Sequence, residues 1–335
     1  PDPNQSGRFI KFFGAADQNQ AFALKEAPDG SLLIVGSQRN FGQTEKAYLI
    51  KTDPFGNLQW EFLFDPANDS SHFSAQDVWV DENQVYLLGY RQFDSTNAPA
   101  HFFFLSIDLE GNTQSVTSRT IGNLAVDPDS RFHLNRNPNN NDFYLLANTA
   151  SNDTPKDSDM YLIRLNGLDS VVFERSYGLL EREDEIGNLL VDPISEDVLW
   201  TGISRREGNA SDMRVVRADA FGNLKFDFTF RENNGLAESG SDIKSVNGGF
   251  ICLGTANEGG ADQIYLNLIN AFGVAQWQAT NGPGLIIPDN DPSFQAKNRE
   301  GRSIFPVEDE TGGYIILGSI RDLNTIGESN EQNQD

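Results

Sequence analysis

Short apolar runs separated by polar loops and tight turns recur along this chain. In residues 29–64, two apolar runs (32–36 and 48–52) flank a polar loop, and a turn leads into an alternating segment (58–64) that ends in aromatic residues. Alternation with a period of two, bounded by Gly, Pro, Asn and Asp, is typical of β-strands. We predict that this stretch forms three strands of one antiparallel meander.

The same pattern repeats about every 50–65 residues. Equivalents of run 32–36 lie at 85–89, 143–147, 198–202, 250–254 and 314–318. Equivalents of run 48–53 lie at 104–108, 161–166, 215–219 and 265–270. An aromatic residue begins the predicted fourth strand at Trp60, Phe173, Phe226 and Trp277. A repeated four-stranded unit of this length is typical of the β-propeller blade. We predict an all-β protein, a β-propeller of six blades of four antiparallel strands. The sixth repeat has no third strand before Asp335. A seventh blade is therefore an alternative if the missing part of the chain is long.

A turn follows each third strand. Asp or Asn opens it by accepting hydrogen bonds from its own backbone, and Gly takes the positive φ that closes it. The third copy, at 166–169, has no Gly at its last position, so we expect a different turn there. The predicted structural turn residues are Asp53, Gly56, Asp108, Gly111, Asp219 and Gly222.

The segment at residues 9–14 matches the aromatic fourth strand at 60–65, yet no strand precedes it. We predict that it is the fourth strand of the last blade and that it closes the ring, which would remove exposed sheet edges. Residues 1–8 are then an N-terminal tether, and residues 9–335 form a single β-propeller domain. Its last blade is incomplete, and we expect the missing strand from polypeptide beyond Asp335.

Charge and composition exclude several classes of function. The chain has 49 acidic and 25 basic residues and a net charge of −24, which argues against binding to nucleic acid or to anionic lipid. A single cysteine, Cys252, excludes a disulfide framework. The three histidines are far apart with no paired spacing, so no zinc site is predicted.

The connections between second and third strands are long, whereas those between first and second strands are short. Long loops on a rigid scaffold are where binding residues gather. Aromatic rings beside amide and charged groups suit a sugar or a peptide, although such rings can also pack against neighbouring loops. The candidate ligand-binding residues are Arg39, Phe41, Tyr90, Arg91, Phe93 and Arg205.

Acidic residues populate the connections between fourth and first strands, namely Asp17, Asp69, Asp184, Glu185, Glu238, Asp289 and Asp291. Carboxylates that converge from several blades could hold Ca²⁺, and no other cofactor is indicated. The sequence has no nucleophile elbow, phosphate-binding glycine loop or paired cysteine motif. The acids leave glycoside cleavage open, because the separation of two carboxylates is a three-dimensional quantity.

The repeat G-x-L-L-I-V-G-S, followed by Y-L-I-K-T-D-x-x-G-N-x-x-W, resembles that of exported β-propeller proteins of Gram-negative bacteria, among them outer-membrane lipoproteins. The matching positions are strand and turn determinants, so no catalytic residue is carried over. The resemblance implies an exported protein at the outer membrane or cell surface, tethered by a lipid anchor. We expect a non-catalytic binding or scaffolding module with a protein partner at the outer membrane. The alternative is a carbohydrate-binding or carbohydrate-cleaving propeller that uses acids and aromatics on the loop-rich rim.

Overall fold

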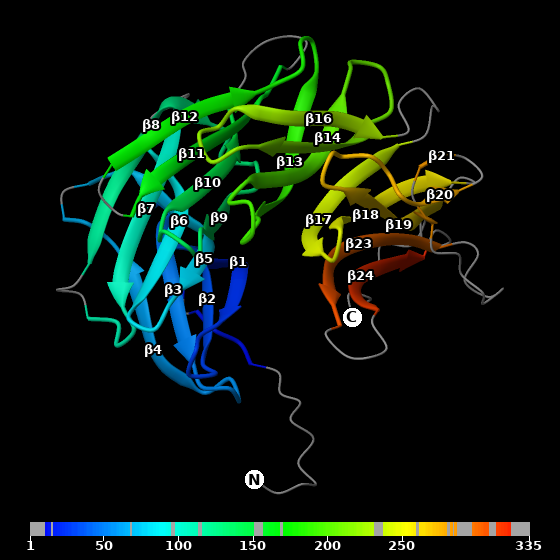
Figure 1. Ribbon diagram of the computed structural model, residues 1–335. Helices are drawn as coiled ribbons and strands as arrows, with labels where there is room; N and C mark the ends of the chain where they lie inside the picture. The colour runs from blue at the N-terminus through cyan, green and yellow to red at the C-terminus, as the bar shows by residue number, and fades with distance from the viewer. Residues whose placement is uncertain are drawn as a thin grey trace, which may run out of the picture. The chain divides into compact units, whose positions relative to one another are not determined.

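The computed structural model describes residues 11–14, 16–67, 69–94, 98–112, 116–150, 157–167, 170–230, 237–258, 261–279, 282–283, 285–286, 297–307 and 313–322. The chain divides into two compact units, which are described separately. Unit 1 comprises residues 1–152 and 160–177, and unit 2 comprises residues 153–159 and 178–335. Both units are built from antiparallel β-sheets (Figure 1).

Unit 1 contains three four-stranded antiparallel meanders, called sheets 1 to 3. Sheet 1 consists of β1 (Gln18–Glu26), β2 (Leu32–Arg39), β3 (Lys46–Thr52) and β4 (Leu58–Phe64). Sheet 2 consists of β5 (His72–Val80), β6 (Gln84–Gln92), β7 (Ala100–Asp108) and β8 (Thr117–Val126). Sheet 3 consists of β9 (His133–Arg136), β10 (Phe143–Asn148), β11 (Met160–Asn166) and β12 (Ser170–Tyr177).

Unit 2 contains sheets 4 to 6. Sheet 4 consists of β13 (Glu183–Val191), β14 (Val198–Arg205), β15 (Asp212–Ala218) and β16 (Leu224–Phe230). Sheet 5 consists of β17 (Glu238–Val246), β18 (Gly249–Glu258), β19 (Ala261–Asn270) and the short β22 (Leu285–Ile286). A small hairpin pairs β20 (Gln278–Ala279) with β21 (Gly282–Pro283), and sheet 6 pairs β23 (Lys297–Pro306) with β24 (Tyr314–Asp322).

These repeated meanders confirm the predicted all-β propeller fold. Every predicted second strand is present as a strand between its predicted neighbours or, in sheet 6, beside β23. Ring closure stays a prediction: Phe9 and Ile10 lie outside the described residues, and the described Lys11–Gly14 has no strand structure. The single-domain assignment also stays a prediction.

The fifth sheet differs from the expected pattern at its fourth strand. The sequence places the start of this strand at Trp277, but Trp277 precedes the small β20–β21 hairpin, and β22 pairs with β19 instead. The hairpin contains Pro283, which lacks a backbone N–H and so cannot donate a hydrogen bond to a neighbouring strand. The fourth strand is therefore displaced along the chain.

Five of the six predicted second-strand runs end at a glycine, and the bulge in the neighbouring first strand explains this residue. In sheets 1 and 2, the first strand carries a β-bulge between Ala21 and Ala23 and between Ala75 and Asp77. A Cβ atom on Gly36 would lie 1.8 Å from the carbonyl oxygen of Gln20, and one on Gly89 would lie 1.7 Å from that of Ser74. Glycine is required because the bulged backbone approaches too closely for any side chain.

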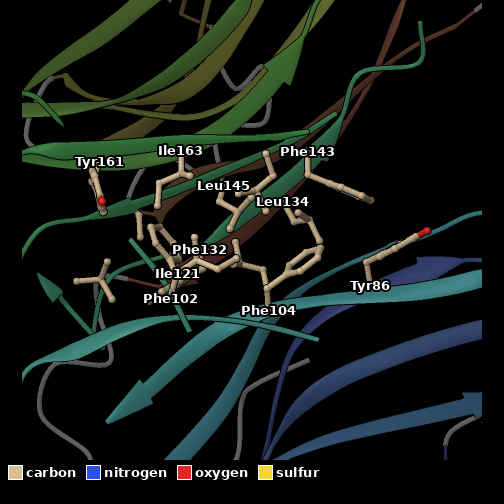
Figure 2. Packing of buried hydrophobic residues seen from close by; sticks show 14 of the residues in the cluster. Tyr86, Phe102, Phe104, Ile121, Phe132, Leu134, Phe143, Leu145, Tyr161 and Ile163 are labelled. Atoms are coloured by element: carbon tan, nitrogen blue, oxygen red, sulfur yellow. The ribbon is translucent and has the colours of Figure 1, made fainter. Parts of the chain in front are cut away.

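Apolar side chains fill the space between neighbouring sheets within each unit. In unit 1, one cluster joins sheets 1 and 2 and a second joins sheets 2 and 3. Figure 2 shows the second cluster, in which Phe104 and Tyr86 of sheet 2 face Phe143 of sheet 3 at ring-centroid distances of 5.4 and 4.6 Å. In unit 2, similar clusters join sheets 4 and 5 and sheets 5 and 6.

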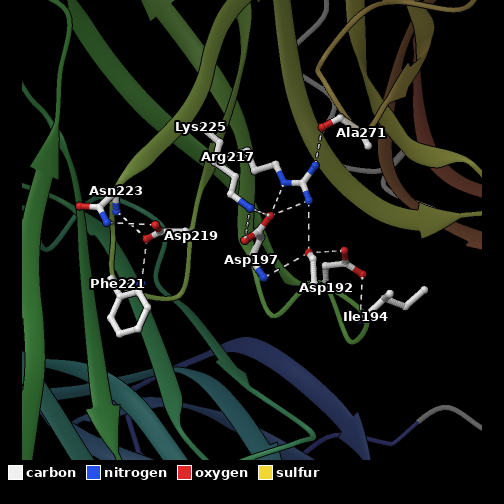
Figure 3. Close-up of polar contacts among 10 residues, drawn as sticks. Asp192, Ile194, Asp197, Arg217, Asp219, Phe221, Asn223, Lys225 and Ala271 are labelled. Atoms are coloured by element: carbon white, nitrogen blue, oxygen red, sulfur yellow. Dashed lines mark hydrogen bonds and ion pairs between the residues drawn. The ribbon is translucent and has the colours of Figure 1, made fainter.

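In sheets 1, 2, 4 and 5, the turn after the third strand is held by its own Asp or Asn side chain. In sheet 4, Asp219 accepts hydrogen bonds from the backbone of Phe221 and Asn223, both at 2.8 Å (Figure 3). Gly222 closes this turn at φ +77°, and Gly56 and Gly111 close theirs at +75°. In sheet 3, Gly167 takes the positive φ instead, at +54°.

An ion cluster around the buried Asp197 lies beside this turn in sheet 4. Asp197 accepts from Arg217 at 2.5 Å and from Lys225 at 2.7 Å, while the guanidinium of Arg217 also donates to the carbonyl of Ala271 in sheet 5 (Figure 3). These bonds hold the short turns of sheets 4 and 5 together.

Candidate functional site

An acidic or amide residue follows the bulge of several first strands, and it links neighbouring sheets. Asp77 on β5 accepts from the backbone N–H of Val78 on its own strand and of Leu134 on β9, both at 2.8 Å. In unit 2, Asp242 on β17 accepts from the backbone N–H of Ile243 at 2.8 Å and of Ile304 on β23 at 2.9 Å. One carboxylate therefore joins two adjacent first strands in both units.

In unit 1, a cavity of about 510 Å³ lies along these first strands. Its walls come from β1, β5, the end of β6, the loop after β2 and the segment that enters β9. The lining residues are Gln20, Phe22, Ala23, Glu45, Gln76, Asp77, Tyr90, Pro128, Asp129, Ser130, Arg131, Phe132 and His133. This volume is within the usual range for small-molecule sites, about 300–1,000 Å³.

Tyr90 and Glu45 form one wall of this cavity. Tyr90 is partly buried at the end of β6, and its Oη donates to Oε2 of Glu45 at 2.9 Å. Burial and the adjacent Glu45 carboxylate raise the pKa of the Tyr90 hydroxyl well above its usual range. The tyrosine therefore stays neutral, and its ring offers an apolar surface beside a fixed carboxylate.

Asp77 forms the wall of the cavity between β5 and β9. Desolvation of its carboxyl group raises its pKa to about 6, against the opposing effect of the Leu134 N–H, Lys25 and the Val78 N–H. At neutral pH the group is mostly a carboxylate whose two oxygens each accept one backbone N–H. It therefore acts here as a positioned acceptor that also fixes the cavity wall.

Taken together, the charged side chains that line the cavity make it acidic. Glu45, Asp77 and Asp129 contribute three carboxylates, whereas Arg131 contributes one guanidinium, and Gln20 and Gln76 add neutral amides. Such an arrangement can hydrogen-bond hydroxyl groups and disfavours anionic ligands.

The predicted ligand-binding residues do not gather in one place. Of those in unit 1, only Tyr90 is among the residues that line the cavity. Phe41 is 96 % exposed on the loop after β2, where its backbone N–H donates to Asp17 at 2.7 Å. The exposed Arg39 donates to the side chain of Gln18 at 2.6 Å.

Arg91 and Phe93 lie together at the end of β6. The Arg91 guanidinium lies 4.6 Å from the centroid of the Phe93 ring, and it pairs with Asp69 at 2.9 Å. Arg205 belongs to unit 2, where it pairs with Glu183 and lies 3.7 Å from Glu185. These arginines are engaged by local carboxylates, and whether they bind a ligand stays a prediction.

The acids considered as Ca²⁺ ligands also have local partners. Asp17 accepts from Phe41, Asp69 pairs with Arg91, and Asp184 pairs with the buried Arg214 at 2.6 Å. Asp289 and Asp291 lie outside the described residues. Among the residues that the structure describes, no group of three or more His, Cys, Asp or Glu side chains could hold a metal ion.

Four lining residues were not predicted from the sequence: Gln76, Asp77, Phe132 and His133. They come from the middle of a first strand and from the entry to β9, whereas the predicted binding residues lie in or beside long loops. The signal that could have found them is the irregular alternation around Asp77, which marks a bulge, and the polar His133 that begins β9.

Several solved structures superpose in part on this chain at low sequence identity. A protein of unknown function from Dyadobacter fermentans superposes with a TM-score of 0.49 at 9 % identity, covering 90 % of this chain and 94 % of that one. An α-L-arabinofuranosidase from Fusarium graminearum gives 0.49 at 9 % identity, covering 92 % and 95 %. A lignostilbene dioxygenase from Pseudomonas brassicacearum gives 0.48 at 11 % identity, and this chain, 80 % of which is aligned, spans 63 % of its length.

No protein-family model matches the sequence. No curated protein matches it either. In the part of the chain that the structure describes, no helix has the length and apolar character that crossing a membrane requires. The β-propeller assignment rests on the repeated four-stranded meanders themselves.

Proposed function

We propose that this protein is a non-catalytic binding module whose cavity in unit 1 holds a neutral, hydroxyl-rich ligand of the carbohydrate class. The observation that carries the proposal is the convergence of Tyr90, Glu45 and Asp77 on one hollow of about 510 Å³. These side chains come from separate strands and loops of sheets 1 and 2.

The chemistry of the walls supports a sugar. Carboxylate and amide oxygens accept hydrogen bonds from hydroxyl groups, and the faces of Tyr90 and Phe22 offer apolar platforms for the C–H surface of a pyranose or furanose ring. Phe22 is 43 % exposed, so its ring is available to a ligand. The excess of carboxylates favours a neutral ligand over an acidic one.

Binding is favoured over catalysis because two of the cavity carboxylates already have structural roles. Glu45 accepts from Tyr90, and Asp77 accepts from two backbone N–H groups on different strands. A general acid or base must exchange its proton with a substrate, and a carboxylate that holds two strands together is poorly suited to that task.

We place the module outside the cell, at the outer membrane or cell surface, with a lipid anchor. This localisation is supported by the resemblance of the repeat to exported propellers, and a charge of −24 is typical of a protein kept soluble by repulsion.

A second candidate function, scaffolding of a protein partner, is favoured by one observation. The turns after the third strands of sheets 1, 4 and 5 each present a phenylalanine at the same position, and Phe55, Phe221 and Phe272 are 59, 68 and 78 % exposed. Exposed aromatic residues are common anchors in protein–protein interfaces.

Native affinity electrophoresis in gels that contain soluble polysaccharides tests the first proposal. We expect one or more neutral polysaccharides, such as arabinan, xyloglucan or galactomannan, to retard the protein, and polygalacturonate to have no effect. Absence of retardation by every neutral polymer, together with loss of a co-purifying partner on Phe221→Ser and Phe272→Ser, would favour the scaffold instead.

A further inference from the structure

Sheets 1 and 3 of unit 1 carry the same tyrosine–glutamate pair on their third and fourth strands. The Oη of Tyr48 on β3 donates to Glu61 on β4, and the Oη of Tyr161 on β11 donates to Glu174 on β12. The register is also the same, because Glu61 lies opposite Ile50 and Glu174 lies opposite Ile163.

In sheet 3, this pair binds the backbone of the preceding sheet. The N–H of Asn123 on β8 donates to Oε2 of Glu174 at 3.0 Å and to Oη of Tyr161 at 3.2 Å. The preceding residue, Gly122, has φ +90°, and a Cβ atom there would lie 2.9 Å from Tyr161 and Ile163. A glycine with positive φ thus brings a fourth strand onto the pair.

In sheet 1, the N-terminal segment lines two hollows that Tyr48 of this pair also lines. Phe12 and Phe13 line a hollow of about 700 Å³ together with Tyr48 and Ile50, and Ala16 lines an adjoining hollow with Tyr48 and Glu61. The Nζ of Lys11 donates to the side chain of Asn57, in the turn before β4, at 3.3 Å.

The segment also has the matching glycine. Gly14 has φ +104°, and in the repeat of the sequence Phe13-Gly14 corresponds to Ile121-Gly122 of β8, each an apolar residue followed by a glycine with positive φ. A Cβ atom on Gly14 would lie 2.4 Å from the side chain of Asn19, so the contact of this segment with Tyr48 and Glu61 is the part that we infer.

We propose that Tyr48 and Glu61 form a receptor for the backbone of the N-terminal segment around Gly14, as Tyr161 and Glu174 do for β8. The occupant of this face of sheet 1 is residues 11–14 of the same chain, which act as a fourth-strand element without a preceding hairpin. The proposal is independent of the cavity and its ligand.

Hydrogen–deuterium exchange on the whole chain tests the receptor. We expect peptides that cover residues 11–14 to exchange more slowly than an unstructured chain, and Tyr48→Phe or Glu61→Gln to accelerate that exchange about tenfold. The matched variants Tyr161→Phe and Glu174→Gln should accelerate peptides from β8 and leave residues 11–14 unchanged. Exchange of residues 11–14 at the unstructured rate in the wild-type protein, or at an unaltered rate in both sheet 1 variants, would overturn the proposal.

A second experiment changes the N-terminal segment and leaves Tyr48 and Glu61 of sheet 1 unaltered. Gly14→Val should speed tryptic cleavage after Lys11 about tenfold, because the side chain is strained at φ +104° and releases the segment. Gly42→Val is the control, since Gly42 has φ +75° in an exposed loop with no neighbouring atom within 4 Å of an added Cβ. Equal cleavage after Lys11 in both variants would contradict the inference.

Discussion

The backbone N–H of Leu134 donates a 2.8 Å hydrogen bond to Oδ2 of Asp77, which joins the first strands of two neighbouring sheets. Asp242 makes the same bond to Ile304 in unit 2 at 2.9 Å. A single side chain after a β-bulge thus links one repeat to the next, and in unit 1 it also forms a wall of the cavity.

The pH dependence of stability should report the ionisation of Asp77. Its pKa is about 6 in the folded protein, above the ordinary value near 4, so between these values the folded state holds a proton that the unfolded chain has released. The stability that Asp77 contributes is therefore fully present below about pH 4 and is lost as the pH rises through 6, by at most about 3 kcal/mol.

Urea unfolding at pH 4.5 and pH 7 measures this effect in the wild-type protein and in Asp77→Asn. We expect the wild type to lose about 2 kcal/mol more than the variant does over this interval. Identical pH dependence in the two proteins would show that Asp77 titrates normally.

Gly89→Ala should destabilise unit 1 by about 3 kcal/mol or more. The added Cβ would lie 1.7 Å from the carbonyl oxygen of Ser74, and backbone rather than a movable side chain would have to shift. Ala147 is the matched control, because it is the equivalent residue of sheet 3, where β9 pairs with β10 without a bulge. Ala147→Gly should cost only about 1 kcal/mol. Equal urea midpoints for Gly89→Ala and the wild type would contradict this account of the bulge.

The repeated apolar runs predicted the strands because their physical cause is local. Each second strand contains an apolar run that ends at a glycine or an alanine, and alternation together with the turn residues is enough to place it. The last residue of the run also reflects the neighbouring strand. Gly36 lies beside the bulged strand β1, whereas Ala147 lies beside the regular strand β9.

The cavity could not be predicted in the same way. Glu45, Asp77, Tyr90 and His133 come from four separate stretches, and only the approach of β1, β5 and β9 brings them together. The fourth strand of sheet 5 could not be placed from the sequence either. Trp277 matched the repeat in position, but a hairpin follows it, and the fourth strand lies at Leu285–Ile286.

Asn267→Ile should stabilise unit 2 by about 1–2 kcal/mol. Asn267 is fully buried on β19, and neither atom of its side-chain amide has a hydrogen-bond partner among the described residues. A buried polar group without a partner costs about 1–3 kcal/mol. The equivalent residue on β11 is the buried Ile163.

The reverse change, Ile163→Asn, serves as the control for Asn267→Ile and should destabilise unit 1 by at least about 2 kcal/mol. Chemical unfolding of both variants measures the pair. A loss of stability in Asn267→Ile would mean that the amide is bonded in solution.

Arg214→Met should destabilise unit 2 by about 3–5 kcal/mol. The Arg214 side chain is 0 % exposed and binds Asp184 and Asp227, both at 2.6 Å, so its removal leaves buried carboxylates without their cation. Arg205→Met is the control, because Arg205 is 41 % exposed and its loss should cost less than about 1 kcal/mol. Comparable urea midpoints for the two variants would contradict the structural role of the buried ion triad.

The retention of Tyr90→Ala and Phe41→Ala by a neutral polysaccharide tests the central claim most directly, because only Tyr90 of the two lines the cavity. We expect Tyr90→Ala to weaken binding about tenfold or more, through loss of the ring and of the hydrogen bond to Glu45, while Phe41→Ala binds like the wild type. Wild-type retention of Tyr90→Ala, or equal loss in both variants, would contradict a ligand site in this cavity.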